Sequence, residues 1–420
     1  MKSWQKKLIY GAGVTLFSSV LVACGNSANK SASDDAAKTA SGAKQLKLWV
    51  PTDSKDSYKE VVEAFEKESG FKVEVVESED PKAQENIKKD PQAAADVFSL
   101  PHDQLGQLVE SGAIQEIPEN YANEVSEQAT DQAIAGAQYK GKTYAFPFGI
   151  ESQVLYYNKE KLSEDQVKSY ESITDNATFG ANFKEVNAYH IAPLFMSVGN
   201  TLFGDNGEDA SGTNWGNDAG VSVLKWIASQ KDNKGFVNVD ANNTMSKFGD
   251  GSVAAFQSGP WDYETAKKSV GEDKLGIAPY PTVKIGDTDV QQKAFLGVKL
   301  YAVNQAPAGG DAERIAASYK LASYLTNEDS QENQFKKRSI VPSNKEVQSS
   351  DEVQNNQLAK TVITMGSSDK YTVVMPKISQ MTAFWTETAA VLSDTYNGKI
   401  KESDYLNKLK QLDKDLADAK

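Results

Sequence analysis

Apolar and polar residues alternate where the body of the chain begins. Every second residue of 46–50 is apolar, which predicts a strand with one buried face. Residues 58–65 then place apolar side chains at helical spacing, and Gly70 follows as a typical helix C-terminus. Residues 71–75 alternate again. A strand, a helix and a strand at this spacing predict a βαβ unit with a parallel pair of strands.

The later chain continues this mixture, with more helix than strand. We expect strands near 96–100 and 295–304, and two strands joined by a turn within 139–158. Helical patterns cover 105–109, 219–230, 311–326 and 380–396. The expected fold class is therefore α/β. Ligands of open α/β sheets bind beyond the carboxyl ends of the strands, which makes Asp53 and His102-Asp103 candidate site positions.

The first residues have the pattern of an export signal. Three lysines within Met1–Lys7 precede an apolar run over residues 8–23, which is short for a spanning helix. The run ends Leu21-Val22-Ala23-Cys24, which resembles the bacterial lipobox. We expect residues 1–23 to be a lipoprotein signal peptide and Cys24 to be the lipidation site; the alternative is an uncleaved membrane anchor. A lipoprotein cysteine carries at least two acyl chains, which suffice for stable anchoring.

Composition and charge narrow the function. Residues 25–44 contain no aromatic or branched apolar residue, so we expect 24–44 to be a flexible tether. The net charge is −13, and becomes −16 when three lysines leave with the signal peptide. Such an acidic surface repels phosphate backbones, so we expect no nucleic-acid partner. One cysteine excludes an intramolecular disulfide, and two histidines without metal-ligand spacing give no reason to expect a metal or another cofactor.

Several blocks of sequence point together to one family. The blocks are Leu48-Trp49 with Asp53, residues 65–73 (FEKESGFKV), Pro101–Gly106 (PHDQLG), residues 141–147 (GKTYAFP) running on to Glu151 and Tyr157-Asn158-Lys159, Gly259-Pro260-Trp261, and Met375-Pro376 running on to Gln380–Trp385 (QMTAFW). In their order and spacing the chain resembles the maltose/maltodextrin-binding proteins of bacterial ABC importers, within the extracellular solute-binding proteins. The resemblance covers nearly everything after Lys44.

The resemblance implies a two-lobe, periplasmic-binding-protein-like fold with discontinuous lobes, a hinge and the ligand in the interlobe cleft. We expect residues 45–150 plus 300–347 in one lobe and 151–299 plus 348–420 in the other. It also implies a monomer that binds a maltodextrin and delivers it to the permease subunits of an ABC transporter, without catalysis. The lipid anchor would hold it at the outer face of the cell membrane. The preference for lysine over arginine favours a Gram-positive source.

The resemblance also implies a set of sugar-binding residues. Carboxylates suit the hydroxyl edges of a sugar and flat aromatic rings suit its apolar faces. By similarity, the carboxylates are Asp53, Asp103 and Glu151, and the stacking residues are Tyr189, Trp261 and Trp385. Other roles remain open: helix caps for the two aspartates, a solvated strand position for Glu151, and core positions for the tryptophans. Trp226 lies in an apolar helical pattern and is expected in the core.

The chain departs from the family pattern at five positions. Well-studied members have an aromatic residue where this chain has Leu100, a lysine at Ser54, a glutamate at Asn187, and arginines at Gln104 and Ala389. One stacking ring and several charged groups are therefore missing. His190 and Asn187 are candidates to supply replacement hydrogen bonds. The departures leave the preferred length of the sugar open.

Three other functions fit part of the sequence. The same fold could carry a raffinose-type sugar or another glucan. The carboxylates and tryptophans could describe a glycoside hydrolase, which needs two carboxylates about 5–10 Å apart, but nothing in the sequence fixes such a pair. A surface adhesin without transport partners is the third reading.

Overall fold

The computed structural model describes residues 44–205 and 207–419. The predicted signal peptide, Cys24 and nearly all of the predicted tether therefore lie outside the described residues. Within those residues the strands form two larger sheets and two short hairpins. Among the helices in this part of the chain, none is both long and apolar enough to cross a bilayer.

The first large sheet is six-stranded and mixed, with the order β15-β14-β3-β1-β2 and with β6 also paired to β14. Its strands are β1 (Gln45–Pro51), β2 (Lys72–Ser78), β3 (Val97–Pro101), β6 (Phe146–Ser152), β14 (Ala294–Val303) and β15 (Thr372–Val374). The predicted βαβ unit is confirmed, because β1 and β2 pair in parallel. The intervening helix α1 (Lys59–Ser69) ends at Gly70, whose φ of 73° is one that glycine adopts without strain.

The second large sheet is five-stranded, with the order β11-β7-β10-β8-β9. Its strands are β7 (Val154–Asn158), β8 (Phe179–Ala181), β9 (Phe236–Asn238), β10 (Ala255–Ser258) and β11 (Leu275–Ala278). The hairpins are β4 (Gln138–Tyr139) with β5 (Lys142–Thr143), and β12 (Thr282–Ile285) with β13 (Thr288–Gln291).

The expectation of two strands within 139–158 was wrong. The segment from Gln138 to Asn158 holds four strands, and β6 and β7 belong to different sheets although only Gln153 separates them. Ser152 and Gln153 are fully buried at this crossing. Polar residues Glu151–Gln153 separate two apolar stretches here, and burial continues through Ser152 and Gln153 from one sheet into the other.

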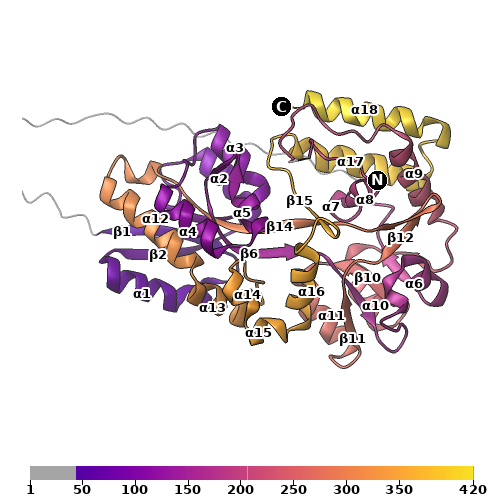
Figure 1. Cartoon of the computed structure of the whole chain (residues 1–420), viewed down its shortest axis with the longest axis horizontal. Helices are drawn as coiled ribbons and strands as arrows, with labels where there is room; N and C mark the ends of the chain where they lie inside the picture. Colours follow the sequence, from indigo (N-terminus) through magenta and orange to yellow (C-terminus); the bar gives the residue numbers. More distant parts are fainter. Residues whose placement is uncertain (1–43, 206, 420) are drawn as a thin grey trace, which may run out of the picture. The chain divides into compact units, whose positions relative to one another are not determined.

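Helices surround both sheets (Figure 1). They are α2 (Ala83–Lys89), α3 (Leu105–Glu110), α4 (Glu119–Gln128), α5 (Asp131–Ala137), α6 (Tyr170–Asn176), α7 (Ala188–Ile191), α8 (Pro193–Ser197), α9 (Asp218–Ser229), α10 (Thr244–Gly249), α11 (Tyr263–Val270), α12 (Ala312–Thr326), α13 (Glu328–Arg338), α14 (Lys345–Ser349), α15 (Asp351–Gln354), α16 (Gln357–Gly366), α17 (Met381–Asn397) and α18 (Tyr405–Asp418). The expected helices at 105–109, 219–230, 311–326 and 380–396 correspond to α3, α9, α12 and α17.

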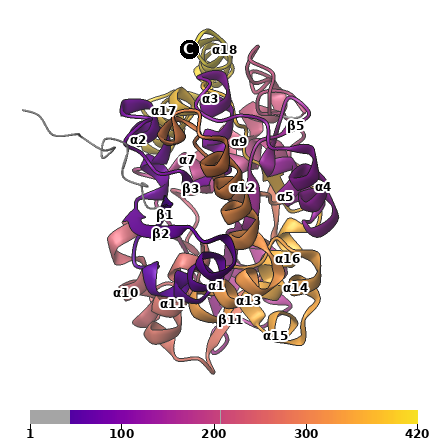
Figure 2. The same ribbon diagram turned by 90° about the vertical axis from the view of Figure 1, so that its left-hand side faces the viewer.

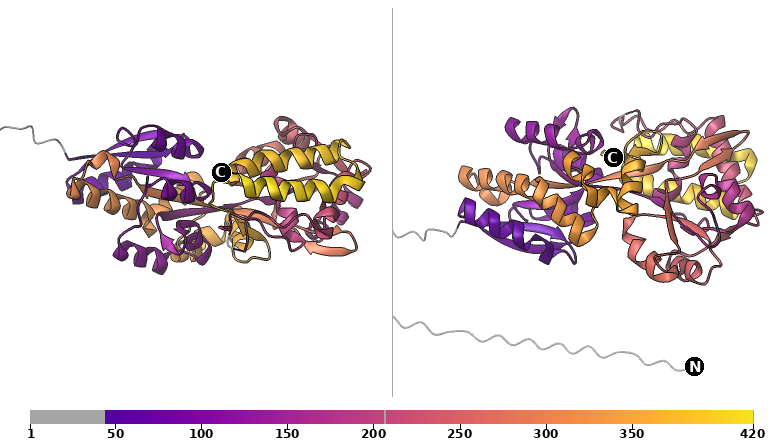
Figure 3. Two further views of the ribbon diagram at one scale, coloured as in Figure 1. Left: turned by 90° about the horizontal axis from the view of Figure 1, so that it is seen from above. Right: turned by 60° about the horizontal axis from the view of Figure 1, so that its bottom comes forward.

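Two packing relations position the helices that matter below. Helix α12 packs against β1, β3 and β14 of the first sheet and against α1, and Figure 2 shows it among these elements. Helices α17 and α18 pack on one another and on α9, and they run side by side in Figure 3. Strand β14 contacts α5 and α12 as well as α7 and α8, so it touches helices associated with each of the large sheets.

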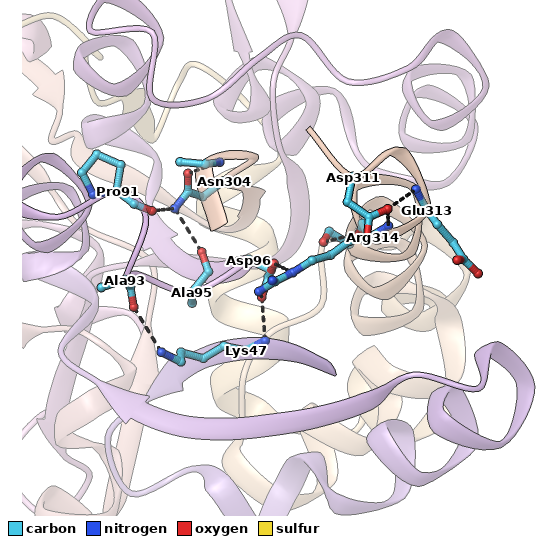
Figure 4. Close-up of polar contacts among 11 residues, drawn as sticks. Lys47, Pro91, Ala93, Ala95, Asp96, Asn304, Asp311, Glu313 and Arg314 are labelled. Atoms are coloured by element: carbon cyan, nitrogen blue, oxygen red, sulfur yellow. Dashed lines mark hydrogen bonds and ion pairs between the residues drawn. The ribbon is translucent and has the colours of Figure 1, made fainter. Parts of the chain in front are cut away.

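A buried ion pair ties α12 to the first sheet (Figure 4). Asp96 is fully buried just before β3. Its Oδ1 accepts a 2.7 Å hydrogen bond from Nε of Arg314, and its Oδ2 accepts from Nη2 of Arg314 at 3.0 Å and from the backbone N–H of Lys47 at 2.8 Å. Asp311 caps the same helix by accepting from the N–H groups of Glu313 and Arg314. Arg314 thus clamps a carboxylate of its own chain.

Candidate functional site

Three of the predicted site residues form one aromatic group. Tyr189 lies on α7, Trp385 on α17, and Trp261 on the short 3-10 helix η6 (Pro260–Asp262). The ring centroid of Tyr189 is 6.3 Å from that of Trp261 and 6.2 Å from that of Trp385, and both pairs are tilted by about 50°. Trp261 is 52% exposed, and no other large hydrophobic side chain among the described residues is exposed. Tyr189 and Trp385 are partly exposed.

Phe295, which sequence reasoning missed, supports this group from below. It is fully buried on β14, with its ring centroid 5.7 Å from that of Tyr189 and 5.6 Å from that of Trp385. Phe384 packs on Trp385 from the buried face of α17. These buried rings hold Tyr189 and Trp385 in place. Less side-chain conformational entropy is therefore lost when the apolar face of a ligand binds to them. In the sequence, the signal that pointed to Phe295 was its place at the start of the strand predicted over 295–304.

Asp103 contributes a carboxylate with an unused acceptor. It lies in the 3-10 helix η3 (His102–Gln104), and its Oδ1 is buried without a hydrogen-bond partner in the described part of the chain. Burial, with a smaller contribution from the charge of Glu151, raises the pKa of Asp103 from 3.8 to about 6. The N-cap residues of η3 and α3 are Pro101 and Gln104, so Asp103 caps neither helix.

Glu151 lies on β6, and its side chain is 22% exposed. Its Oε2 is 2.8 Å from Nζ of Lys299, so it is an ion-paired residue rather than a solvated one. Burial, followed by the charges of Glu151 and Asp103, raises the pKa of Tyr189, so both carboxylates are within electrostatic range of a ring of the aromatic group. The structure therefore brings Asp103, Glu151, Tyr189, Trp261 and Trp385 together.

No hydrogen bond or ion pair joins Asp53 to the other five predicted residues in the described part of the chain. Its side chain is exposed in the turn after β1 and makes no hydrogen bond to the described residues. It does not cap the following 3-10 helix η1 (Lys55–Tyr58), whose N-cap residue is Ser54. Its φ of 57° lies in the left-handed region, which aspartate and asparagine adopt more often than other residues apart from glycine. A role in binding remains a prediction for Asp53.

His102 is a structural residue beside this site. It is fully buried; its Nδ1 accepts from the N–H of Val298 at 3.0 Å, so Nε2 carries the proton and donates to the carbonyl of Met375 at 3.1 Å. Burial, and then the charge of Lys377, lowers the pKa of His102 to about 3, so the ring is neutral. It fixes η3, and with it Asp103, against β14.

The two residues considered as replacement donors have other partners. Asn187 caps α7, because its Oδ1 accepts from the N–H of Tyr189 at 3.0 Å. His190 is hydrogen bonded through Nδ1 to the amide of Gln153, and burial lowers the pKa of His190 to about 4. Tyr280 donates to the other end of the same amide at 3.0 Å. Asn187 therefore orients Tyr189. His190 is held by Gln153, the residue at which the chain passes from the first large sheet to the second.

Three departures from the family pattern are buried in the fold. Leu100 is 1% exposed and pairs with Leu300 of β14, so it cannot offer a stacking face. Ser54 is 3% exposed and donates to the carbonyl of Pro51. Gln104 is 9% exposed, and its Oε1 accepts from the N–H of Gln84. Trp226, expected in the core, packs on Tyr170 and Phe183.

A cavity of about 690 Å³ lies elsewhere. Its lining includes Gln132 and Ala135 of α5 and Gln138 of β4, and it includes none of the six predicted residues. Val298 faces Gly136 of α5, whereas Phe295 and Lys299 face the aromatic group and Glu151. Side chains alternate across a strand, so Val298 and the pair Phe295 and Lys299 point to opposite faces of β14. Within 44–205 and 207–419 no cluster of three His, Cys, Asp or Glu side chains suits a metal ion.

Comparison with known proteins identifies the family. Residues 60–361 match the family described as bacterial extracellular solute-binding protein, which is more than half of the chain. The chain belongs to this family. A maltodextrin-binding protein from L. casei BL23, solved without ligand, is 35% identical and superposes with a TM-score of 0.84 over 89% of this chain and 98% of that one. The predicted fold class is confirmed: this solute-binding protein has a two-lobe α/β fold of the periplasmic-binding-protein type.

Two curated relatives differ in the sugar that their names give. The maltooligosaccharide ABC transporter solute-binding lipoprotein of Streptococcus pneumoniae (strain R6) is 29% identical over 92% of this solute-binding protein and 91% of its own length. The galactooligosaccharide-binding protein of Bacillus subtilis (strain 168) is 28% identical over 90% of each chain. Identities this close cannot by themselves select the sugar.

Proposed function

We propose that this solute-binding protein binds malto-oligosaccharides and delivers them to an ABC importer. The observation that carries the proposal is the grouping of Tyr189, Trp261 and Trp385 beside two carboxylates, Asp103 and Glu151. The likeness to a maltodextrin-binding protein at 35% identity supports it. The relative from Streptococcus pneumoniae supports the coupling to an ABC transporter.

The proposed complex uses both sides of a glucose unit. The exposed ring of Trp261 and the rings of Tyr189 and Trp385 take the apolar faces. Oδ1 of Asp103 and Oε1 of Glu151 accept from hydroxyl groups; hydrogen bonds to charged acceptors are about twice as strong as neutral ones. A hydroxyl donated to Oδ1 of Asp103 also fills a buried acceptor without a partner in the described residues, which removes a desolvation cost.

Transport follows from the hinged fold. The lobes proposed above, 45–150 with 300–347 and 151–299 with 348–420, close on the sugar because the closed state binds it more tightly. The proposed lipid on Cys24 and the tether of residues 24–44 keep the monomer near the permease, outside the cell membrane, which raises its effective concentration there. No covalent step is proposed for this chain.

A sugar panel tests the cargo. Unfolding is measured with maltose, maltotriose, maltotetraose, raffinose, a galacto-oligosaccharide and a β-glucan oligomer. A sugar at a hundred times its Kd stabilises the protein by about 2.7 kcal/mol. We expect stabilisation that grows from maltose to maltotetraose. Stabilisation by the galacto-oligosaccharide alone would select the second candidate, which the relative from Bacillus subtilis favours.

A further inference from the structure

The side chain of Glu151, on β6, extends over the neighbouring strand β14 and reaches a lysine on the same face of the sheet. Glu151 pairs in register with Gly297, and a Cβ at Gly297 would come within 2.8 Å of Cγ of Glu151. The missing side chain at Gly297 lets Glu151 extend over the strand to Lys299, two residues further on. Nζ of Lys299 is 2.8 Å from Oε2 of Glu151, and the Lys299 side chain is 27% exposed.

A second carboxylate and an arginine lie around the same lysine. Asp80, the first residue of the 3-10 helix η2 (Asp80–Lys82), is within electrostatic range of Lys299, Glu151 and Arg338, and its Oδ1 accepts a 2.5 Å hydrogen bond from Ser99. Burial raises the pKa of Asp80 in spite of these partners. Burial acts against the charge of Lys299, but Glu151 and Asp80 together raise the pKa of Lys299 above its usual value, so it is a cation.

Charges of opposite sign therefore surround Lys299: it is ion-paired with Glu151 and within electrostatic range of Asp80, and Glu151 is within electrostatic range of Asp103. Without Lys299 these three carboxylates would face one another with Arg338 as the remaining cation near Asp80. Arg338 is held by other groups, because its Nη1 donates to Tyr58 at 3.2 Å and to Gln334 at 3.1 Å. A cation at Lys299 is needed if Glu151 is to lie charged beside Asp103 in a partly dehydrated site.

We propose that Lys299 is a further residue of the sugar site, which positions Glu151 and itself contacts the sugar, with Asp80 as its buried counter-charge. This inference rests on the proposed function. An ammonium group has three N–H donors, so Lys299 can hold Oε2 of Glu151 and still donate to a sugar hydroxyl, while Oε1 of Glu151 accepts from one. It also supplies a cation in a chain that lacks the family's basic residues at Ser54, Gln104 and Ala389.

The test is a double-mutant cycle on the full chain, solubilised in detergent. Kd for the most stabilising sugar of the panel is measured by calorimetry for wild type, Lys299→Met, Glu151→Gln and the double variant. We expect each single substitution to weaken binding about tenfold or more, and the double variant to be little weaker than either, because the two residues act together. Lys225→Met is the matched control, since Lys225 forms an exposed ion pair with Glu402 and should leave Kd unchanged.

A structural role for Lys299 gives a different result. Lys299→Met would then lower the unfolding midpoint of the sugar-free protein but leave Kd as in wild type, which overturns the inference. If the two substitutions weaken sugar binding additively, Lys299 does not position Glu151, and that part of the inference is overturned. If wild type binds no sugar of the panel, the proposed function itself fails.

A measurement on wild type covers the case in which Lys299→Met does not fold. The protein is acetylated with an amine reagent with and without saturating sugar, and the modified lysines are quantified by mass spectrometry. We expect sugar to slow the modification of Lys299 about fivefold, because the bound hydroxyl covers its amine, and to leave Lys225 unaffected. Equal rates at Lys299 with and without a sugar that binds would overturn the contact.

Discussion

One carboxylate precedes strand β3 and another follows it, and the two have opposite surroundings. Asp96, before the strand, uses both oxygens to accept three hydrogen bonds from Arg314 and Lys47. Asp103, after the strand, leaves Oδ1 buried without a partner among the described residues. Asp96 is saturated by its own chain, whereas Asp103 keeps an acceptor for a group from outside. The comparison separates a carboxylate that holds the fold together from one that is available to a ligand.

Arg314→Met should have the largest effect and should act on stability. It leaves Asp96 buried with an unpaired charge, so we expect the free energy of unfolding to fall by about 3 kcal/mol, at the lower end for a buried pair because Arg314 is 31% exposed. The measurement is chemical denaturation. Sugar affinity of the folded variant should equal that of wild type, and a weakened affinity would contradict the distinction between the two carboxylates.

Asp103→Asn should act mainly on affinity. The amide keeps the shape but offers a weaker, uncharged acceptor, so Kd should rise about thirtyfold, or about 2 kcal/mol. Calorimetry with the sugar identified by the panel measures it. Asp96→Asn serves as the comparison, and it should lower stability with little change in the Kd of the folded fraction. Unchanged affinity in Asp103→Asn would remove this residue from the site.

The stability of the sugar-free protein should depend on pH through Asp103. Between pH 3.8 and about 6 the folded state keeps the Asp103 proton and the unfolded state loses it, because the pKa is raised on folding. The contribution of Asp103 is therefore fully present below pH 3.8 and is lost as the pH rises to about 6. The loss is about 2 kcal/mol, discounted for the partial exposure of Asp103, and it should be missing in Asp103→Asn.

Trp261→Ala should weaken sugar binding about fivefold, or about 1 kcal/mol, because one stacking face is lost. Its ring is 52% exposed, so the unfolding midpoint should barely change. Trp215 gives the matched contrast: it is fully buried and stacks on Phe195 with ring centroids 4.0 Å apart. Trp215→Ala should lower stability strongly. A large loss of stability in Trp261→Ala would indicate a core role for Trp261.

Lys225→Met should have the smallest effect. The ion pair with Glu402 is exposed on both sides, where water and salt screen it. We expect no measurable change in the unfolding midpoint or in Kd. A clear loss would show that exposed pairs contribute to this fold, which would weaken the contrast with Arg314.

The elements with strong periodicity followed from the sequence alone. Helices α9, α12 and α17 and strand β14 lie within one residue of their expected bounds, and the βαβ unit at the start forms as expected although β2 runs on to Ser78. Their spacing of apolar residues matches the period of the element, and caps such as Gly70 mark where one ends. The family blocks also indicated five residues that lie together, namely Asp103, Glu151, Tyr189, Trp261 and Trp385.

Tertiary structure alone decided which chemistry surrounds those residues. No local pattern shows that β6 and β7 enter different sheets at Gln153, or that Gly297 lets Glu151 reach Lys299. Asp96 and Asp103 have similar surroundings in the sequence, at the two ends of one strand. They differ because Arg314 arrives at one end from 218 residues away, and no described side chain satisfies the buried oxygen at the other. Burial and pairing are set by contacts between distant segments, so the sequence names the candidate groups and the fold determines which of them remain available.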